Sequence, residues 1–174
     1  MKLESFQEEV DGAVKWSFGK LDVEPSSEHD ARYIAANLRP ADLAEISAST
    51  RTPPVQVIVD GAAESDPCYT IRVRATGQPC GIFGTRHSEH TQSGIVWLLG
   101  TENLTTHGTL FVRHSRIWLD KLHEKYNLLW NVIDARNKVH LNWLRWLGFD
   151  FVREIPNYGT EKRTFILFRK YKDD

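Results

Sequence analysis

The sequence has few of the features that mark membrane, secreted or repetitive proteins. No apolar run among its 174 residues approaches the roughly 18–20 residues that cross a membrane. Residues 1–5 contain no apolar segment of the kind that a signal peptide needs. Internal repeats and low-complexity tracts are absent as well. We therefore expect one cytoplasmic domain, long enough to bury about two-thirds of its unfolded surface.

Cysteine is scarce, and the two cysteines are poorly placed for a disulfide. They lie on adjacent strands of a predicted hairpin that turns at Thr76 and Gly77. If the turn is tight, Cys80 faces Val73, about five residues along the strand from Cys68. At about 3.3 Å per residue the thiols are roughly 16 Å apart, which is too far for a disulfide. We expect two free, half-buried thiols.

Signals for metal and nucleic-acid binding are weak. His87 and His90 lie in a polar stretch with no Cys or third ligand at a zinc-site spacing, so we expect no metal. Charge is uneven: residues 1–66 carry 13 acidic and 6 basic residues, whereas residues 67–174 carry 10 acidic and 16 basic ones. Acidic residues interrupt the basic ones, and we therefore do not expect a nucleic-acid partner.

Periodicity along the chain predicts alternating helices and strands. Apolar residues at every second position indicate strands, recurrence every three or four positions indicates helices, and Pro40, Asn137 and Gly148 suit helix ends. Residues 55–63 are compatible with either element, and we choose helix. The expected strands are 31–38, 69–75, 80–86, 94–100, 128–134, 149–155 and 164–170, and the expected helices follow Pro40 and cover 55–63, 106–126 and 137–148.

This order, β-α-α-β-β-β-α-β-α-β-β, predicts an α/β domain with a mixed central sheet and helices on both faces. Residues 1–30 are interpreted as an acidic N-terminal extension with one short helix near residues 6–14. Residues 31–174 would then form the domain itself.

The order is that of the GNAT (acyl-CoA N-acyltransferase) fold, and two segments strengthen the resemblance. Residues 37–46, NLRPADLAEI, resemble the first strand–helix turn of that superfamily. Residues 130–137, WNVIDARN, with Leu147-Gly148-Phe149 downstream, resemble its strand–Asn–helix–Gly-Phe signature. Residues 110–155 are also similar to a family of internal virion or virion-assembly proteins of short-tailed phages, at Glu124-Lys125-Tyr126, Leu129-Trp130-Asn131, Asn137, His140 and Leu147-Gly148.

The GNAT resemblance implies an acyl-coenzyme A, such as acetyl-CoA, held between two central strands that splay apart, and an amine as acyl acceptor. The modest positive charge of the C-terminal half would suit the phosphates of coenzyme A. The cofactor-binding residues that it implies are Val96, Trp97, Leu98 and Leu99 on the first strand, Thr105, Thr106, His107, Gly108 and Thr109 at the start of the next helix, and Asn137.

Two hallmarks of the superfamily are altered. Its phosphate loop, Gln/Arg-x-x-Gly-x-Gly/Ala, overlays residues 105–110, where Gly108 matches but Leu110 replaces a small residue and should crowd an approaching pyrophosphate. Many members place a tyrosine general acid four residues before the glycine of Gly-Phe, and here that position is Leu144. The alternative for 105–110 is an ordinary helix start capped by threonines, and Asn137 is equally explained as a helix N-cap.

The candidate general bases are Glu102, just beyond the first central strand, and Asp134, at the end of the second. Each is also explained as a solvated or helix-start carboxylate. Two functions remain open: an acyl-CoA-dependent N-acyltransferase with degenerate motifs, or an inactive protein of the same fold that acts by protein–protein contact in virion assembly. Trp143 and Trp146 cannot both face the core, which leaves apolar surface for a phage or host protein partner. The location would be the host cytoplasm or the virion.

Overall fold

The computed structural model describes residues 6–10, 13–89 and 92–173 and contains one nine-stranded mixed sheet. The strands lie in the order β1-β2-β3-β4-β5-β6-β7-β9-β8. Neighbours are antiparallel except for β6 and β7, which are parallel. Their bounds are β1 Phe6–Val10, β2 Ala13–Phe18, β3 Leu21–Pro25, β4 Ser65–Val73, β5 Pro79–His87, β6 Ser93–Gly100, β7 Leu128–Asp134, β8 Asp150–Tyr158 and β9 Arg163–Tyr171.

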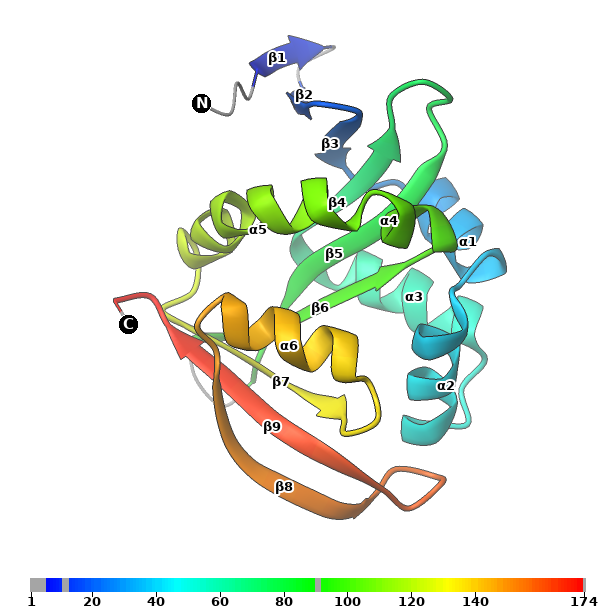
Figure 1. Ribbon diagram of the computed structural model, residues 1–174, viewed down its shortest axis with the longest axis vertical. Helices are drawn as coiled ribbons and strands as arrows, with labels where there is room; N and C mark the ends of the chain where they lie inside the picture. The colour runs from blue at the N-terminus through cyan, green and yellow to red at the C-terminus, as the bar shows by residue number, and fades with distance from the viewer. Residues whose placement is uncertain (1–5, 11–12, 90–91, 174) are drawn as a thin grey trace.

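Helices cover both faces of the sheet (Figure 1). One face carries α4 Glu102–Thr106, α5 Gly108–His123 and α6 Lys138–Trp146, and the other carries α1 Glu28–Ala36, α2 Pro40–Ser49 and α3 Pro54–Ala63. The main core lies under α5 and α6, and a smaller core lies between the sheet and α1–α3. Among the described residues, no helix is long and apolar enough to cross a membrane.

The N-terminal part differs from the sequence prediction. Residues 6–10 and 13–18 form strands rather than a helix: Val14, Trp16 and Phe18 alternate with polar residues, Val14 pairs with β1, and Trp16 and Phe18 pair with β3. Phe18, Leu21 and Val23 are buried in the main core. Residues 6–25 therefore continue the same sheet, and the boundary expected at residue 30 falls inside α1.

The strand predicted at residues 31–38 is wrong, because residues 31–36 belong to α1 and only Leu38 forms an isolated bridge, to Thr101. Ser27 and Asp30 form a capping box: Asp30 N–H donates to Ser27 Oγ at 3.2 Å, and Ser27 N–H donates to Asp30 Oδ2 at 3.1 Å. Ala31 and Ile34 are buried on one face, as helical spacing requires. Local capping thus outweighs the strand preference of Tyr33 and Ile34.

The remaining predictions agree with the structure, apart from one helix break. The helices after Pro40 and over residues 55–63, the strands of both hairpins, and β7 are present, and Gly148 ends α6 with φ of +84°. The helix predicted over 106–126 is interrupted at His107, which separates α4 from α5. Cys68 and Cys80 are free thiols, half-buried and buried respectively.

Candidate functional site at the gap between β6 and β7

The two parallel central strands pair at one end and diverge at the other. Ser93, Gly94 and Ile95 of β6 pair with Leu128, Leu129 and Trp130 of β7, and the ladder between these strands ends there. β7 continues to pair with β9 over its full length, from Leu128 to Asp134. On the side toward β7, residues 96–99 therefore face a gap, while their other side stays paired with β5. The splay implied by the GNAT resemblance is present in the structure.

Asn131 marks the point where the gap opens. Its Nδ2 donates to the carbonyl oxygen of Val96 at 2.8 Å, and its Oδ1 accepts from the N–H of Val132 at 2.7 Å. In a β-strand, the N–H and C=O of one residue point to the same edge, and the N–H and C=O of the residue two positions further on point to that edge too. The N–H and C=O of Leu98 consequently face the gap as well, and they provide a strand edge for an extended ligand.

A clamp from α2 holds the far end of β6. Asp42, 1% exposed, accepts from the N–H of Gly100 at 2.8 Å and from Nε of Arg39 at 2.8 Å. The N–H of Arg39 donates to the Gly100 carbonyl at 3.0 Å. Because a buried carboxylate is stable only with such partners, the clamp fixes the end of β6 to α2, whereas β7 stays with β9. This arrangement keeps the gap open.

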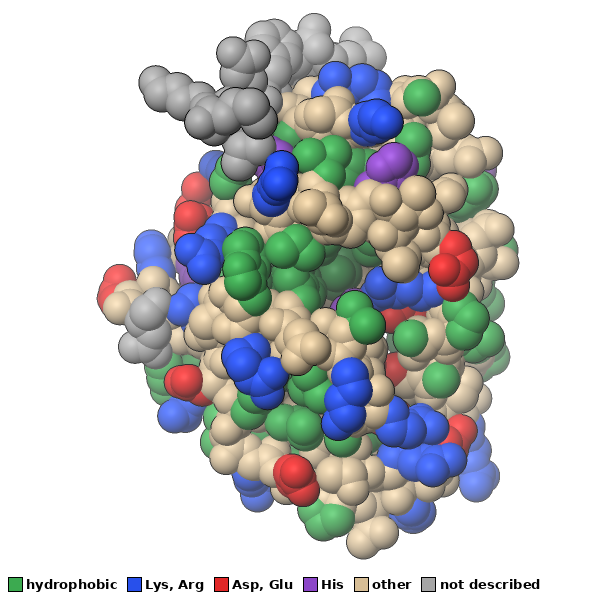
Figure 2. Space-filling view, viewed as in Figure 1, with side chains coloured by type: hydrophobic (Ala, Val, Ile, Leu, Met, Phe, Trp, Pro, Cys, Tyr) green, Lys and Arg blue, Asp and Glu red, His purple; other side chains and the backbone are tan. Residues whose placement is uncertain are grey.

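The gap belongs to a cavity of about 360 Å³ that reaches both faces of the sheet. Figure 2 shows hydrophobic side chains in a hollow between α5 and α6. The predicted cofactor residues Val96, Trp97, Leu98 and Leu99 all line the cavity. Val96 and Leu98 pack against the core under α5, and Trp97 and Leu99 pack against the core under α3.

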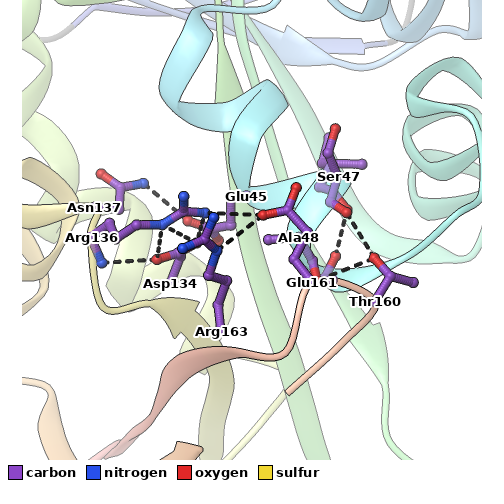
Figure 3. A network of polar contacts seen from close by, with 11 residues as sticks. Glu45, Ser47, Ala48, Asp134, Arg136, Asn137, Thr160, Glu161 and Arg163 are labelled. Atoms are coloured by element: carbon purple, nitrogen blue, oxygen red, sulfur yellow. Dashed lines mark hydrogen bonds and ion pairs between the residues drawn. The ribbon is translucent and has the colours of Figure 1, made fainter. Parts of the chain in front are cut away.

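Glu45 of α2 lines the same cavity and has an unusual environment. Its Oε2 accepts from Nδ2 of Asn137 at 3.0 Å (Figure 3). Burial, with further repulsion from Asp42 and Asp134, raises the pKa of Glu45 from 4.5 to about 7, although the Asn137 hydrogen bond opposes this rise. A carboxylate with such a pKa gains and loses a proton near neutrality, as a general base must.

His140 of α6 also lines the cavity, but it is not suited to the same task. Its Nε2 contacts the Arg39 guanidinium. Burial and the positive charge of Arg39 lower the pKa of His140 to about 4, although Asp42 opposes the shift. His140 is therefore neutral at pH 7 and links α6 to the α2 clamp.

Neither of the two predicted bases lies on the cavity wall. Glu102 is exposed at the first position of α4. Asp134 is buried and accepts from Nε and Nη2 of Arg136, at 3.0 and 2.6 Å, and from the Arg136 N–H at 2.8 Å. Burial alone would raise the pKa of Asp134, but these hydrogen bonds outweigh it and lower the pKa. Asp134 is thus an ionised structural carboxylate.

The predicted phosphate-binding residues lie together at the α4–α5 junction. Thr105 and Thr106 end α4 and are exposed, His107 joins the helices, and Gly108 and Thr109 begin α5. A Cβ at Gly108 would meet no atom within 4 Å, so the helix start is open. Its first N–H groups could receive an anion.

Leu110 does not occupy that opening in the way the sequence suggested. Its side chain packs against the β2–β3 turn, where a Cβ at Gly19 would lie 3.0 Å from Leu110 Cδ2. The side chain is half-buried and joins the main core. The β2–β3 turn therefore accounts for a leucine at this position.

Asn137 serves two structural roles at once. Its Oδ1 caps α6 by accepting from the N–H of His140 at 3.3 Å, and its Nδ2 holds Glu45. The N-cap alternative is therefore correct, and a cofactor contact stays a prediction. Leu144, in the position of the tyrosine acid, is buried and lines the cavity, so this wall carries no hydroxyl there.

The β8–β9 turn contacts the C-terminal end of α2, the helix that carries Glu45 (Figure 3). Thr160 Oγ1 donates to the Ser47 carbonyl at 2.9 Å, and the Glu161 N–H donates to the Ala48 carbonyl at 3.2 Å. These donors satisfy carbonyls at the end of α2, the helix that carries Glu45. Arg163 Nε donates to Glu161 at 3.1 Å and completes the network.

Glu45 was missed from the sequence although it lies in the NLRPADLAEI segment. Helical spacing offered one signal, because Glu45, Ile46 and Ser49 share a face of α2 that lines the cavity. Its partner Asn137 is 92 residues away, so the raised pKa had no local signature. Among the described residues, no group of three or more His, Cys, Asp or Glu side chains is arranged to hold a metal ion.

Solved structures with a similar fold are GNAT-family acetyltransferases. The ribosomal-protein-S5-alanine acetyltransferase of Vibrio fischeri matches with a TM-score of 0.69 at 17% identity, over 92% of this chain and 97% of that one. Ard1 of Thermoplasma volcanium matches with a TM-score of 0.68 at 15% identity, over 88% and 98%. YncA of Salmonella typhimurium, solved with its cofactor acetyl-CoA, gives 0.66 at 14% identity, over 90% and 96%.

No protein-family model matches the sequence, and the comparison with curated proteins finds no match. At identities of 17% or less, the structural likeness establishes the fold: the chain has the GNAT architecture.

Proposed function

We propose that this protein is an acyl-coenzyme A-dependent N-acyltransferase in which Glu45 acts as the general base. The observation that carries the proposal is the gap between β6 and β7, which opens into a cavity bordered by a carboxyl group whose pKa is about 7. The GNAT architecture supports the assignment, and one similar structure is solved with acetyl-CoA.

The residues around the gap fit an acyl-coenzyme A. The backbone N–H and C=O of Leu98 would pair with amide groups of a pantetheine arm, since their side of β6 faces the gap. The open helix start at Gly108 would receive the phosphates. When bound, the cofactor supplies an acyl group activated as a thioester.

Glu45 would handle the proton of the acceptor amine. Transfer forms a bond from the amine nitrogen to the acyl carbon and breaks the carbon–sulfur bond, with its electron pair going to sulfur. The ionised Glu45 carboxylate takes the proton that the nitrogen loses, and Asn137 holds its Oε2 during this step. Leu144 has no proton to give, so the thiol proton comes from solvent.

The competing function is that of an inactive protein acting by protein–protein contact in virion assembly, as the phage resemblance suggested. The aliphatic Leu144 and the outer face of α6 favour this alternative. Trp146 is 43% exposed there and lies under the Arg116 guanidinium, 4.5 Å from its ring centre. Aromatic and arginine side chains are enriched in protein interfaces. An inactive protein would not need a titrating Glu45 beside an open gap, and we therefore favour the enzyme.

Thermal unfolding with coenzyme A and acetyl-CoA tests the proposal. A ligand present at 100 times its dissociation constant should stabilise the fold by about 2.7 kcal/mol. We expect the melting temperature to rise with either compound. An unchanged melting temperature at millimolar concentrations would contradict the proposed enzyme and favour the virion role, which detection of the protein at fixed copy number in purified virions would then support.

A substitution at the start of α5 tests where the phosphates of the cofactor bind. Gly108→Trp should abolish the melting shift, since the indole would cover the helix start. The variant should fold, because the space at Gly108 is open. Retained binding in Gly108→Trp would show that the phosphates bind elsewhere.

A further inference from the structure

The cavity extends beyond the thioester slot into a chamber between α5 and α6. We define the α5–α6 chamber by six of the side chains that line the cavity on this face: Leu119, Leu122, Leu144, Leu147, Phe149 and Phe168. All six are buried, with exposures between 4% and 7%. They come from α5, α6, the segment after α6, and β9, and every one is a hydrocarbon.

The chamber is continuous with the gap between the strands. Val96 and Asn131, which meet where the gap opens, border the same cavity as the chamber residues. A group entering from the slot would therefore meet mainly apolar walls on this face, because the Ser115 hydroxyl is engaged with the Val112 carbonyl and the Trp143 indole, and His140 with Arg39. Apolar walls gain free energy by excluding water from a hydrocarbon, whereas a polar acyl group would lose hydrogen bonds there.

The size of the cavity also argues for a large occupant. Protein interiors are close-packed, and voids much larger than a water molecule are few. An apolar cavity of roughly 150 Å³ already holds a benzene molecule, and this cavity, with the gap between β6 and β7 included, measures about 360 Å³. The single methyl group of an acetyl substituent would leave much of the apolar wall without contacts.

From these observations we infer that the α5–α6 chamber is an acyl pocket for an apolar acyl chain of several carbons, longer than acetyl. The inference rests on the proposed function and specifies its acyl donor. Leu144 then has a positive role: where a tyrosine would place a hydroxyl, this chain extends the hydrocarbon wall.

Calorimetric titration of the full chain with coenzyme A and with acetyl-, butyryl-, hexanoyl- and octanoyl-CoA tests the inference. Each methylene that becomes buried should tighten binding by a factor of about four. We expect hexanoyl-CoA to bind at least about tenfold more tightly than acetyl-CoA. Equal or weaker binding of the longer thioesters would overturn the acyl pocket, while binding of coenzyme A itself would leave the proposed function standing. Failure of every compound to bind would overturn both.

Two filling variants locate the chamber. Leu147→Phe on one wall and Leu122→Phe on the other should each reduce the hexanoyl-to-acetyl affinity ratio at least about tenfold, because added volume displaces the chain. Ile117→Phe, on the exposed face of α5, is the matched control and should leave the ratio unchanged. Two variants are used in case one does not fold. An unaltered ratio in a folded filling variant would show that the chain does not enter the chamber.

Discussion

Two neighbouring carboxylates, Glu45 and Asp134, illustrate how differently one functional group can behave within the same network. Glu45, on α2, accepts from the Asn137 amide, and its pKa rises to about 7. Asp134, at the end of β7, binds the Arg136 guanidinium and backbone, and its pKa falls. The difference follows from their partners: a cation supports the charged form, whereas burial with a neutral donor and nearby anions opposes it.

The comparison teaches that position at the end of a central strand is not enough to make a catalytic base. Asp134 has the expected place in the sequence, but its oxygens are occupied. Its charge nevertheless contributes to the site by raising the pKa of Glu45. We therefore regard Asp134 as a residue that acts through Glu45.

The largest effect should come from removing the carboxylate of Glu45. Glu45→Gln should reduce acyl transfer to an amine by about 100-fold or more, the usual contribution of a general base. Steady-state kinetics with hexanoyl-CoA and acetyl-CoA would measure it. Glu102→Gln, which alters an exposed carboxylate, is the control and should leave the rate unchanged. Equal activity of Glu45→Gln and the parent protein would exclude Glu45 as the base.

The same substitution should stabilise the folded protein above neutral pH. Because the pKa of Glu45 is higher in the folded state than its ordinary 4.5, the unfolded chain ionises first, and wild-type stability falls as pH rises from about 4.5 to 7. Glutamine does not titrate. Glu45→Gln should therefore match wild type below pH 4.5 and exceed it at pH 8 by up to roughly 3 kcal/mol. Urea unfolding of both proteins at pH 4 and pH 8 provides the measurement. If the free energies of unfolding of Glu45→Gln and wild type differed by the same amount at both pH values, the raised pKa would be contradicted.

A single methyl group can disturb the contact between the β8–β9 turn and the end of α2. At Gly159, φ is +65° and an added Cβ would lie 2.3 Å from the Ala48 carbonyl oxygen. Gly159→Ala should destabilise the protein by about 2 kcal/mol, through strain and lost contacts with α2. Gly77→Ala has a similar φ of +69° but no atom within 4 Å, so it isolates the backbone strain and should cost about 1 kcal/mol. Equal losses in thermal unfolding would show that the turn does not press on α2.

The smallest effect should come from changing the charge of Asp134. Activity should rise with pH as Glu45 ionises near pH 7. Asp134→Asn removes a nearby negative charge and releases Arg136, and both changes lower the pKa of Glu45. The rising limb of the kcat/KM profile should move to lower pH. A limb that stays in place would mean that the two carboxylates do not interact.

Prediction from sequence succeeded where short-range patterns decide the structure. β7 was located to the residue because its segment is mostly apolar and ends at Asp134, and α6 was located by the Asn137 cap and by Gly148. It failed at residues 31–38, where the capping box of Ser27 and Asp30 was overlooked. It failed also at residues 6–18, where alternation was visible but the acidic composition suggested an extension.

The candidate site was predicted only in part, because some of its features depend on contacts between residues far apart in the sequence. Residues 96–99 were expected to face a gap, and they line the cavity. The base that we propose, Glu45, differs from the predicted Glu102 and Asp134, which were chosen by position in the chain, without knowledge of their partners. The pKa of Glu45 depends on Asn137, Asp42 and Asp134, and two of these residues are about 90 positions away in the sequence.

The amino-acid sequence by itself determined the central strands, the helix caps and the apolar faces, because those depend on residues within a few positions of one another. Only the tertiary structure decided that β6 parts from β7, that Asp42 clamps Gly100, and that Glu45 titrates near neutrality. Burial and charge–charge interactions act through space, and folding sets which distant groups meet.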